Sequence, residues 1–361
     1  MSTPLQDILA QRIRDNGPLN IGEFMAEALT HPQHGYYMDK DPFGRAGDFT
    51  TAPEISQMFG EMIGVWAADL WQLMGAPESF IWLECGPGRG TLSADALRAT
   101  RHVPGFHEAA EIHLLEASPV LKKAQAQALA GFKPVWHETL ETLPAGKPLI
   151  LIANEFLDAL PIRQMLKTAK GWEERVVATD IGGTGLVYAS RDLTSEDRAR
   201  IPTHITGTPE GTIFEFSPAR DLFIKAVCRC LREHGGAALF IDYGYERSAP
   251  GETLQAVRAH EYVPVLSKPG ESDISAHVDF GQLLRTARDS GVHTLGPVPQ
   301  GRFLQTLGIG LRAQTLAQKA SSVQREELEK ALHRLTDSAQ MGALFKVAGL
   351  YYGTKTVPTG F

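Results

Sequence analysis

One short stretch, IWLECGPGRGTL at residues 81–92, restricts the folds that are open to this chain. Its apolar start, together with Phe80, has the composition of a buried parallel strand. The glycines that follow allow a tight turn and the close approach of a ligand, because they carry no Cβ atom. Thr91 then begins a segment of helical character that runs to about Thr100. A strand, a glycine turn and a helix in this order predict a nucleotide-type βα unit.

The spacing of the glycines bears on the ligand. A dinucleotide fingerprint, G-x-G-x-x-G, requires glycine at position 91, where this chain has Thr91. The chain reads G-x-G-x-G instead, at Gly86, Gly88 and Gly90, with Glu84 just before it, a pattern typical of proteins that bind S-adenosylmethionine (SAM). The ammonium and sulfonium groups of SAM suit a carboxylate here, whereas a pyrophosphate would be repelled by it. A glycine motif alone fits a plain turn equally well.

The composition is that of a globular protein and excludes some partners. With 361 residues and 43% hydrophobic content, the chain can bury a sizeable core. The net charge of −7 argues against a general binder of nucleic acid or of anionic membranes. No stretch approaches the ~18 apolar residues of a transmembrane helix, so we expect no membrane span.

The cysteines and histidines give two further expectations. Cys85, Cys228 and Cys230 form no CxxC pair and predict no disulfide framework, which favours a reducing compartment. We therefore expect a cytoplasmic location. The histidines show no metal-ligand spacing, so we expect no metal site.

The N-terminal part predicts helices and one long irregular loop. Apolar periodicity indicates helices at residues 5–14, 21–29 and 56–74. The loop between the last two, from Tyr36 to Ser56, is rich in Gly, Pro and aromatic residues, and we expect it to form an ordered lid or a wall of the site. We expect residues 1–77 to form an N-terminal helical region with this lid-like loop, and residues 78–361 to form the core.

The core region continues with βα alternation and two additions. Apolar strands at residues 111–115, 135–136, 149–153 and 237–241, with helices at 120–130 and 219–234, predict a parallel doubly wound sheet. Short alternating stretches between residues 162 and 217 predict an antiparallel β insertion. Residues 247–341 are expected to add loops, helices at 280–290, 302–316 and 326–341, and a strand near 293–295; residues 344–351 are expected to form a last strand.

Acids end two of these strands. Glu116 lies where a Rossmann-like fold presents a carboxylate to ribose hydroxyls; the alternative is a solvated acid at a strand end. Asn154, Glu155 and Asp158, in NEFLDALP, follow the fourth strand, where the substrate meets the cofactor in such sheets. Paired carboxylates can orient a guanidinium and accept a proton. They can equally be acids that favour a helix start.

A few other residues are weaker candidates. Asp242 and Tyr243 end the fifth strand and are expected to face the same crevice. His277 fits a catalytic base or, with the higher prior, a structural histidine. Cys85 fits a small core residue better than a nucleophile, because no histidine is paired with it locally.

Several ordered blocks of sequence together resemble the MidA-type family: ECGPGRGTL, GDFTTAPEISQMFGE, NEFLDALP, DYGY, DISAHVDF and MGALFKV. This family comprises bacterial and mitochondrial relatives of the respiratory complex I assembly factor that methylates protein arginine. The resemblance implies a Rossmann-like SAM methyltransferase with family insertions. It also implies a protein arginine acceptor, which in the mitochondrial case is a complex I core subunit. PQGRFL at residues 299–304 departs from the family pattern at Pro299, where a Thr is expected, and at Arg302, where an acid is expected.

The resemblance also implies roles for residues that match by position. Those implied to bind SAM are Glu84, Gly86, Gly88, Gly90 and Glu116. Glu155 and Asp158 are implied to lie on the acceptor side. Separately from the resemblance, we expect Asn154 to position their turn.

Three other functions remain as alternatives. A non-catalytic assembly chaperone would be expected to have a damaged cofactor loop, yet the glycines and both acids are intact. A nucleotide-dependent oxidoreductase is disfavoured by Thr91. A methyltransferase with a different acceptor is the third possibility that the sequence leaves open.

Overall fold

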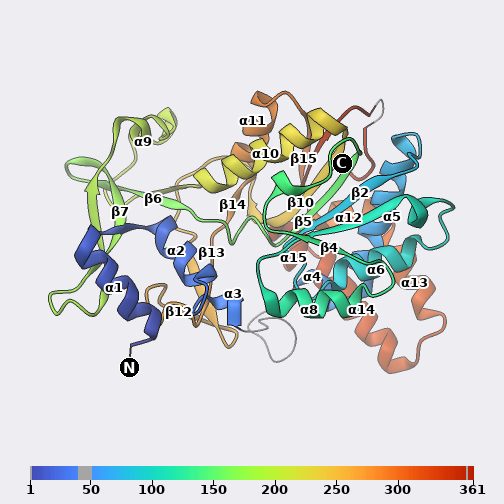
Figure 1. The fold of residues 1–361 in the computed structure, drawn as a ribbon, viewed down its shortest axis with the longest axis horizontal. Coiled ribbons are helices and arrows are strands. Elements are labelled where there is room, and N and C mark those ends of the chain that lie inside the picture. The colour runs from blue at the N-terminus through green and yellow to red at the C-terminus, as the bar shows by residue number, and fades with distance from the viewer. Residues whose placement is uncertain (1, 40–50, 355–356) are drawn as a thin grey trace.

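The structure is a computed structural model that describes residues 2–39, 51–354 and 357–361 (Figure 1). Residues 40–50, the middle of the expected lid-like loop, lie outside the described residues. Among the described residues, no helix combines the length and the apolar character that a membrane crossing needs.

A mostly parallel sheet forms the centre of the larger part of the molecule. Its main strands are β2 (Phe80–Cys85), β3 (Ala110–Leu115), β4 (Val135–His137), β5 (Leu149–Asn154), β10 (Gly236–Tyr245), β15 (His293–Pro299) and β16 (Phe345–Tyr352). They lie in the order β15-β16-β10-β5-β2-β3-β4. The strands from β4 to β10 pair in parallel, whereas β16 runs antiparallel to both of its neighbours. The short β14 (Val278–Asp279) adds to β10. The predicted α/β, Rossmann-like fold class is therefore confirmed.

Helices cover both faces of this sheet. One face packs against α5 (Gln57–Leu73), α6 (Thr91–Thr100) and α7 (Phe106–Ala109), with Trp66, Trp82 and Phe106 at the centre of that layer. The other face packs against α10 (Pro218–His234) and α11 (Phe280–Asp289). Because both faces are covered, every residue of β2 and β5 is buried, which explains their continuous apolar sequences. α8 (Pro119–Ala128) follows β3 and begins at a Ser118 cap and a first-turn proline.

A second, antiparallel sheet lies at the far end of the molecule (Figure 1). Its strands are β6 (Arg163–Thr168), β7 (Gly171–Thr179), β8 (Leu186–Asp192) and β9 (Ile213–Phe216), with α9 (Ser195–Ala199) between the last two. Two residues of the N-terminal region, β1 (Leu19–Asn20), also pair with β7. The sequence predicted antiparallel strands here but missed β6, whose charged residues hide the alternation.

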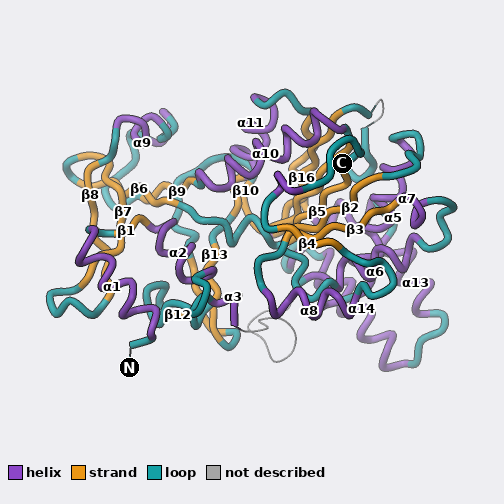
Figure 2. Tube along the Cα trace, viewed as in Figure 1, coloured by secondary structure: helices purple, strands orange, loops and turns teal. Residues whose placement is uncertain are grey.

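The N-terminal helices α1 (Pro4–Asn16), α2 (Ile21–Thr30) and α3 (Tyr36–Asp39) pack beside this second sheet. They share an apolar cluster with a small sheet formed by β11 (Gln255–Arg258), β12 (Glu261–Val263) and β13 (Asp273–Ser275), visible beside α2 in Figure 2. The sequence predicted mostly loop over that stretch. Strands this short carry too few residues to establish a period, which explains the difference.

The C-terminal helices differ in detail from the prediction. The single helix expected at residues 302–316 is split into α12 (Gln300–Thr306) and α13 (Ile309–Ala317) by Gly308, whose φ is 91°. The helix expected at 326–341 is α14 (Ser322–Thr336), which starts earlier because Ser321 and Gln324 form a capping box. A short α15 (Met341–Leu344) precedes the final strand.

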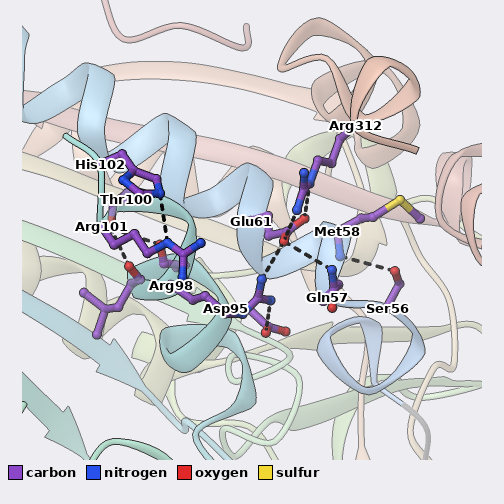
Figure 3. A network of polar contacts seen from close by, with 12 residues as sticks. Ser56, Gln57, Met58, Glu61, Asp95, Arg98, Thr100, Arg101, His102 and Arg312 are labelled. Carbon is purple, nitrogen blue, oxygen red and sulfur yellow. Dashed lines mark hydrogen bonds and ion pairs between the residues drawn. The ribbon is translucent and has the colours of Figure 1, made fainter. Parts of the chain in front are cut away.

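A buried carboxylate joins three of these helices (Figure 3). Glu61 of α5 is 2% exposed and accepts hydrogen bonds from Arg312 Nε at 2.7 Å and Nη2 at 2.8 Å, on α13. It also accepts one from Arg98 Nη1 of α6 at 2.8 Å. This network ties the N-terminal helix α5 to the core and to the C-terminal helices.

Candidate functional site

The turn after β2 has a backbone that only glycine adopts readily. Gly86, Gly88 and Gly90 have φ values of 64°, 54° and 84°, in the left-handed region. A Cβ atom on Gly86 would lie 2.9 Å from the ring of Phe156, so the close approach also requires glycine. Gly90 is the N-cap of α6. The turn therefore exposes the N-terminus of α6 at the carboxyl edge of the sheet.

Glu84, near the end of β2, is buried with few hydrogen-bond donors to stabilise its charge. It is 3% exposed, and its Oε2 accepts a hydrogen bond from the Ser93 hydroxyl. Burial raises the pKa of Glu84 to about 8. Glu84 lines a small hollow beside the glycine turn together with Glu54, Thr91 and Asn154. A cation in this hollow would stabilise the ionised carboxylate.

Glu116 lines a larger cavity of about 290 Å³ on the other side of the turn. Its Oε1 accepts a hydrogen bond from the Ser118 backbone N–H at 2.8 Å, and its Oε2 accepts one from Gln125 Nε2 at 3.0 Å. Gln125 Nε2 also donates to the Gly88 carbonyl at 2.7 Å. Gln125 thus connects the glycine turn to Glu116. Sequence reasoning missed this role, because α8 shows only helical periodicity at that position.

The walls of the larger cavity come from distant parts of the chain. The glycine turn, the turn after β5, the end of β3 and the start of α8 contribute lining residues, and so do the N-terminal helices α2 and α3. These residues are Gly86, Gly88, Phe156, Leu115, Leu121, Ala26, Thr30, Tyr37 and Met38. Glu155 lines both this cavity and the small hollow. The glycine turn and the NEFLDALP turn therefore meet, as expected for the carboxyl edge of a doubly wound sheet.

Glu155 begins the turn after β5 in a strained conformation. Its φ is 49°, a left-handed value that is uncommon for a residue with a side chain. Its Oε1 accepts hydrogen bonds from the Ala52 backbone N–H at 3.1 Å and from Asn154 Nδ2 at 3.3 Å. Burial, with a smaller contribution from Asp158, raises the pKa of Glu155 to about 7. A carboxyl group with this pKa can act as a proton acceptor near neutral pH.

Asp158 lies deeper in the same turn. Its Oδ2 accepts a hydrogen bond from the Tyr243 hydroxyl at 2.5 Å. Asp158 Oδ1 and Asn154 Oδ1 are buried and meet no donor among the described residues. Burial raises the pKa of Asp158. Two buried acceptor atoms without donors favour a ligand that carries N–H groups.

Asp242 lies within β10, which continues beyond the expected strand end at Ile241 to Tyr245, and its carboxylate holds this turn. Its Oδ2 accepts hydrogen bonds from the backbone N–H groups of Leu157 at 3.0 Å and Asp158 at 3.1 Å. Burial, with the neighbouring Asp158 and Glu155, raises the pKa of Asp242 well above its usual range. Asp242 and Tyr243 thus both contact the NEFLDALP turn.

Two further contacts come from Arg220, which has no signal in the sequence, and from Tyr37, which lies in the stretch expected to form a wall of the site. The Arg220 guanidinium of α10 donates to the carbonyls of Leu157 at 2.7 Å, Asp158 at 3.3 Å, Ala276 at 2.8 Å and His277 at 2.8 Å. The Tyr37 hydroxyl of α3 donates to Asp273 Oδ1 at 2.6 Å. Both residues are distant in sequence from these partners.

The weaker candidates His277 and Cys85 lie among packed side chains. The His277 ring lies edge-on to the Tyr243 ring at 5.3 Å, and burial lowers the pKa of His277. Cys85 is fully buried, and burial raises the pKa of its thiol, so it is a core residue. In the described ranges no group of three or more His, Cys, Asp or Glu side chains has the geometry to hold a metal ion.

Comparisons with known proteins identify relatives along most of the chain. Residues 62–298 match a family model described as a putative S-adenosyl-L-methionine-dependent methyltransferase. The chain is 35% identical to the protein arginine methyltransferase NDUFAF7 homolog, mitochondrial, of Drosophila melanogaster, over 96% of this chain and 84% of that protein. It is 32% identical to protein arginine methyltransferase NDUFAF7, mitochondrial, of Homo sapiens, over 96% of this chain and 83% of that protein.

A solved structure shares the whole fold. A COG1565 superfamily member from Burkholderia thailandensis, bound to S-adenosyl-homocysteine, matches with a TM-score of 0.83 and 28% identity. The match covers 99% of this chain and 96% of that one. Because that relative binds the demethylated form of SAM, the match indicates SAM as the cofactor here.

The relatives correct one expectation. The cytoplasmic location expected from the free cysteines is wrong, because the curated relatives are named mitochondrial and so point to mitochondria instead. Free thiols indicate only a reducing environment, which does not by itself identify the compartment.

Proposed function

The chain belongs to the family of putative SAM-dependent methyltransferases, and from that premise we propose that it is a protein arginine N-methyltransferase acting on a subunit of respiratory complex I. It uses SAM, which when bound supplies an electrophilic methyl group on its sulfonium. The names of the curated relatives support an arginine acceptor in a protein. The resemblance of the ordered sequence blocks supports complex I as the source of that protein.

The residues around the glycine turn fit this cofactor. The Glu84 carboxylate is buried and has no cationic hydrogen-bond partner among the residues that the structure describes, so it suits an ammonium group. The left-handed glycines let the backbone approach a ligand closely. Glu116 is held at the cavity edge by Ser118 and Gln125, ready to accept from ribose hydroxyls. We therefore assign Glu84, Gly86, Gly88, Gly90 and Glu116 to cofactor binding.

The observation that carries the acceptor assignment is the buried pair of acids after β5. Glu155 lines both hollows beside the glycine turn, and Asp158 follows it with one oxygen that lacks a donor in the described part of the chain. A guanidinium is protonated at neutral pH and is a poor nucleophile. Two carboxylates can hold its charge away from the attacking nitrogen and then accept the proton that leaves. Asn154 positions the turn through its bond to Glu155.

The test is methyl incorporation from labelled SAM into a candidate complex I subunit, with arginine identified as the modified residue. The wild-type protein should modify arginine, and Asp158→Asn should do so far more slowly. Glu326→Gln is a matched control on the surface helix α14, where the side chain pairs with Lys330, and it should behave as the wild type. A wild-type protein that binds the subunit but transfers no methyl group would favour an assembly chaperone.

A further inference from the structure

A short hydrogen bond to the acidic turn comes from a tyrosine side chain rather than from the backbone. The Tyr243 hydroxyl contacts Asp158 Oδ2 at 2.5 Å, while Asp158 Oδ1 meets no donor among the described residues. The two oxygens of one buried carboxylate therefore differ, since Oδ2 accepts a hydrogen bond from Tyr243 and Oδ1 accepts none among the described residues. A ligand N–H group is the partner that Oδ1 lacks.

Both partners of this hydrogen bond are fixed. The Tyr243 ring packs edge-on against His277 at 5.3 Å and against Phe345 at 5.5 Å. The Asp158 backbone N–H donates to Asp242 Oδ2 at 3.1 Å, and its carbonyl accepts from the Ala276 N–H at 3.0 Å. The hydroxyl and the carboxylate therefore cannot separate without disturbing β10 or the turn.

Several charged or titratable groups face Asp158 and Tyr243. They are Glu155 in the same turn, Asp242 on β10, Arg220 on α10, Tyr37 on α3 and His277 before β14. Burial opposes ionisation of Asp158, whereas the Tyr243 hydroxyl and Arg220 favour it and so limit the rise in its pKa. Burial raises the pKa of Tyr243 well above its usual range, so the phenol stays protonated and acts as the donor.

We propose that Tyr243 is a positioning residue for methyl transfer, holding Asp158 by Oδ2 so that Oδ1 receives an N–H of the acceptor guanidinium. This inference rests on the proposed function, because it needs Asp158 on the acceptor side. Tyr243 gains and loses no proton over the reaction. Its hydroxyl orients the carboxylate and stabilises its ionised form, which is the form that can bind a guanidinium.

The test compares Tyr243→Phe with the wild type in steady-state methyl transfer across pH. Losing a hydrogen bond to a charged group should lower kcat on the order of 10- to 100-fold, with the KM for SAM unchanged. The acidic limb of the pH profile should move to higher pH, because the ionised form of Asp158 loses a stabilising donor. That limb belongs to the coupled acids of the turn, so its displacement, not its absolute position, is the readout.

A matched control lies on the same strand. Tyr245 is two residues further along β10 and lines a separate cavity near Arg285, so Tyr245→Phe should leave both kcat and the pH profile unchanged. If Tyr243→Phe does not fold, 3-fluorotyrosine at position 243 keeps the ring and the hydroxyl but makes the phenol a stronger donor. It should move the acidic limb to lower pH.

Asp158→Asn separates failure of this inference from failure of the proposed function. If Asp158→Asn transfers methyl groups as fast as the wild type, the acceptor assignment of Asp158 is wrong and this inference is wrong with it. If Asp158→Asn is slow but Tyr243→Phe keeps the wild-type kcat and pH profile, only the role of Tyr243 is overturned. The double variant carries both Asp158→Asn and Tyr243→Phe. If adding Tyr243→Phe to Asp158→Asn no longer lowers kcat, the inference is supported; if it lowers kcat as much as it does in the wild type, the inference is contradicted.

Discussion

The Ala52 backbone N–H donates a hydrogen bond of 3.1 Å to Glu155 Oε1, which joins the short helix α4 (Ala52–Ile55) to the turn after β5. The same helix contacts the glycine turn, because the Thr91 hydroxyl donates to Glu54 Oε1 at 2.6 Å. One turn of helix thus supports both the start of α6 and the acid proposed to face the acceptor. Glu155 is held from outside its own strained turn, which fits a residue whose orientation matters for function.

Replacing Glu155 with Gln removes the charge and keeps the size. We expect SAM affinity close to that of the wild type and methyl transfer slowed on the order of a hundredfold or more, because positioned proton transfer and charge stabilisation are lost. Calorimetry measures the affinity, and labelled SAM measures the transfer. Full activity in this variant would remove Glu155 from the reaction, whereas a parallel loss of affinity would place it in the cofactor site.

The pH dependence of SAM affinity should report on Glu84. Burial raises the pKa of this group to about 8, so it holds a proton in the free protein at neutral pH. An ammonium placed beside it favours the ionised form, so binding should release a proton and affinity should rise with pH, by up to about tenfold per unit between pH 6 and 8. Calorimetry in buffers of different ionisation enthalpy measures the released proton. Glu84→Gln should abolish that release; if it persists, the proton comes from another group.

Glu116→Ala tests the ribose contact. Loss of hydrogen bonds to a charged acceptor should weaken SAM binding by roughly 1–3 kcal/mol. Because Gln125 also contacts Gly88 and Glu116, part of that loss could come from a shifted glycine turn. Glu116→Gln keeps a partner for the Ser118 N–H and so serves as the control for the turn. Unchanged affinity in both variants, measured by calorimetry, would place the ribose elsewhere.

The sequence predicted the core of the fold because its strands are buried on both faces. β2 and β5 have mostly apolar sequences, which is typical of buried parallel strands. The glycine turn after β2 indicates a nucleotide-type βα unit. The small sheet of β11, β12 and β13 could not be predicted, since its strands depend on packing against α2 rather than on their own pattern. The break between α12 and α13 depends on a single glycine, Gly308, inside a helical period.

The sequence predicted those site residues that belong to local motifs at strand ends. Glu84, Glu116 and the NEFLDALP acids end strands, and the carboxyl ends of parallel strands meet at one edge. Their roles remain predictions. Two supports of that edge could not be found in the same way, because each is a single side chain from a distant element. Gln125 comes from α8 and Arg220 from α10, and periodicity describes only which face of a helix is buried.

Glu61 should contribute to stability rather than to the chemistry. It is 2% exposed and binds Arg98 and Arg312, whose side chains are 39% and 33% exposed. Glu61→Gln leaves two guanidinium groups that can turn to water, so we expect a loss of about 1–3 kcal/mol, less than for a fully buried pair. Urea unfolding measures it. Glu326→Gln, which breaks an exposed pair with Lys330, should keep the midpoint close to that of the wild type.

The difference between Glu61→Gln and the wild type should also depend on pH. Burial opposes ionisation of Glu61, but the hydrogen bonds from Arg312 and Arg98 outweigh it and lower its pKa below the usual 4.5. A lowered pKa stabilises the folded state above about pH 4.5, and this contribution is lost as the pH falls through the folded value. Unfolding curves at pH 7 and at progressively lower pH should therefore converge for the two proteins. A difference that stays constant down to the acid limit would mean that packing, not the charge of Glu61, joins α5 to α6 and α13.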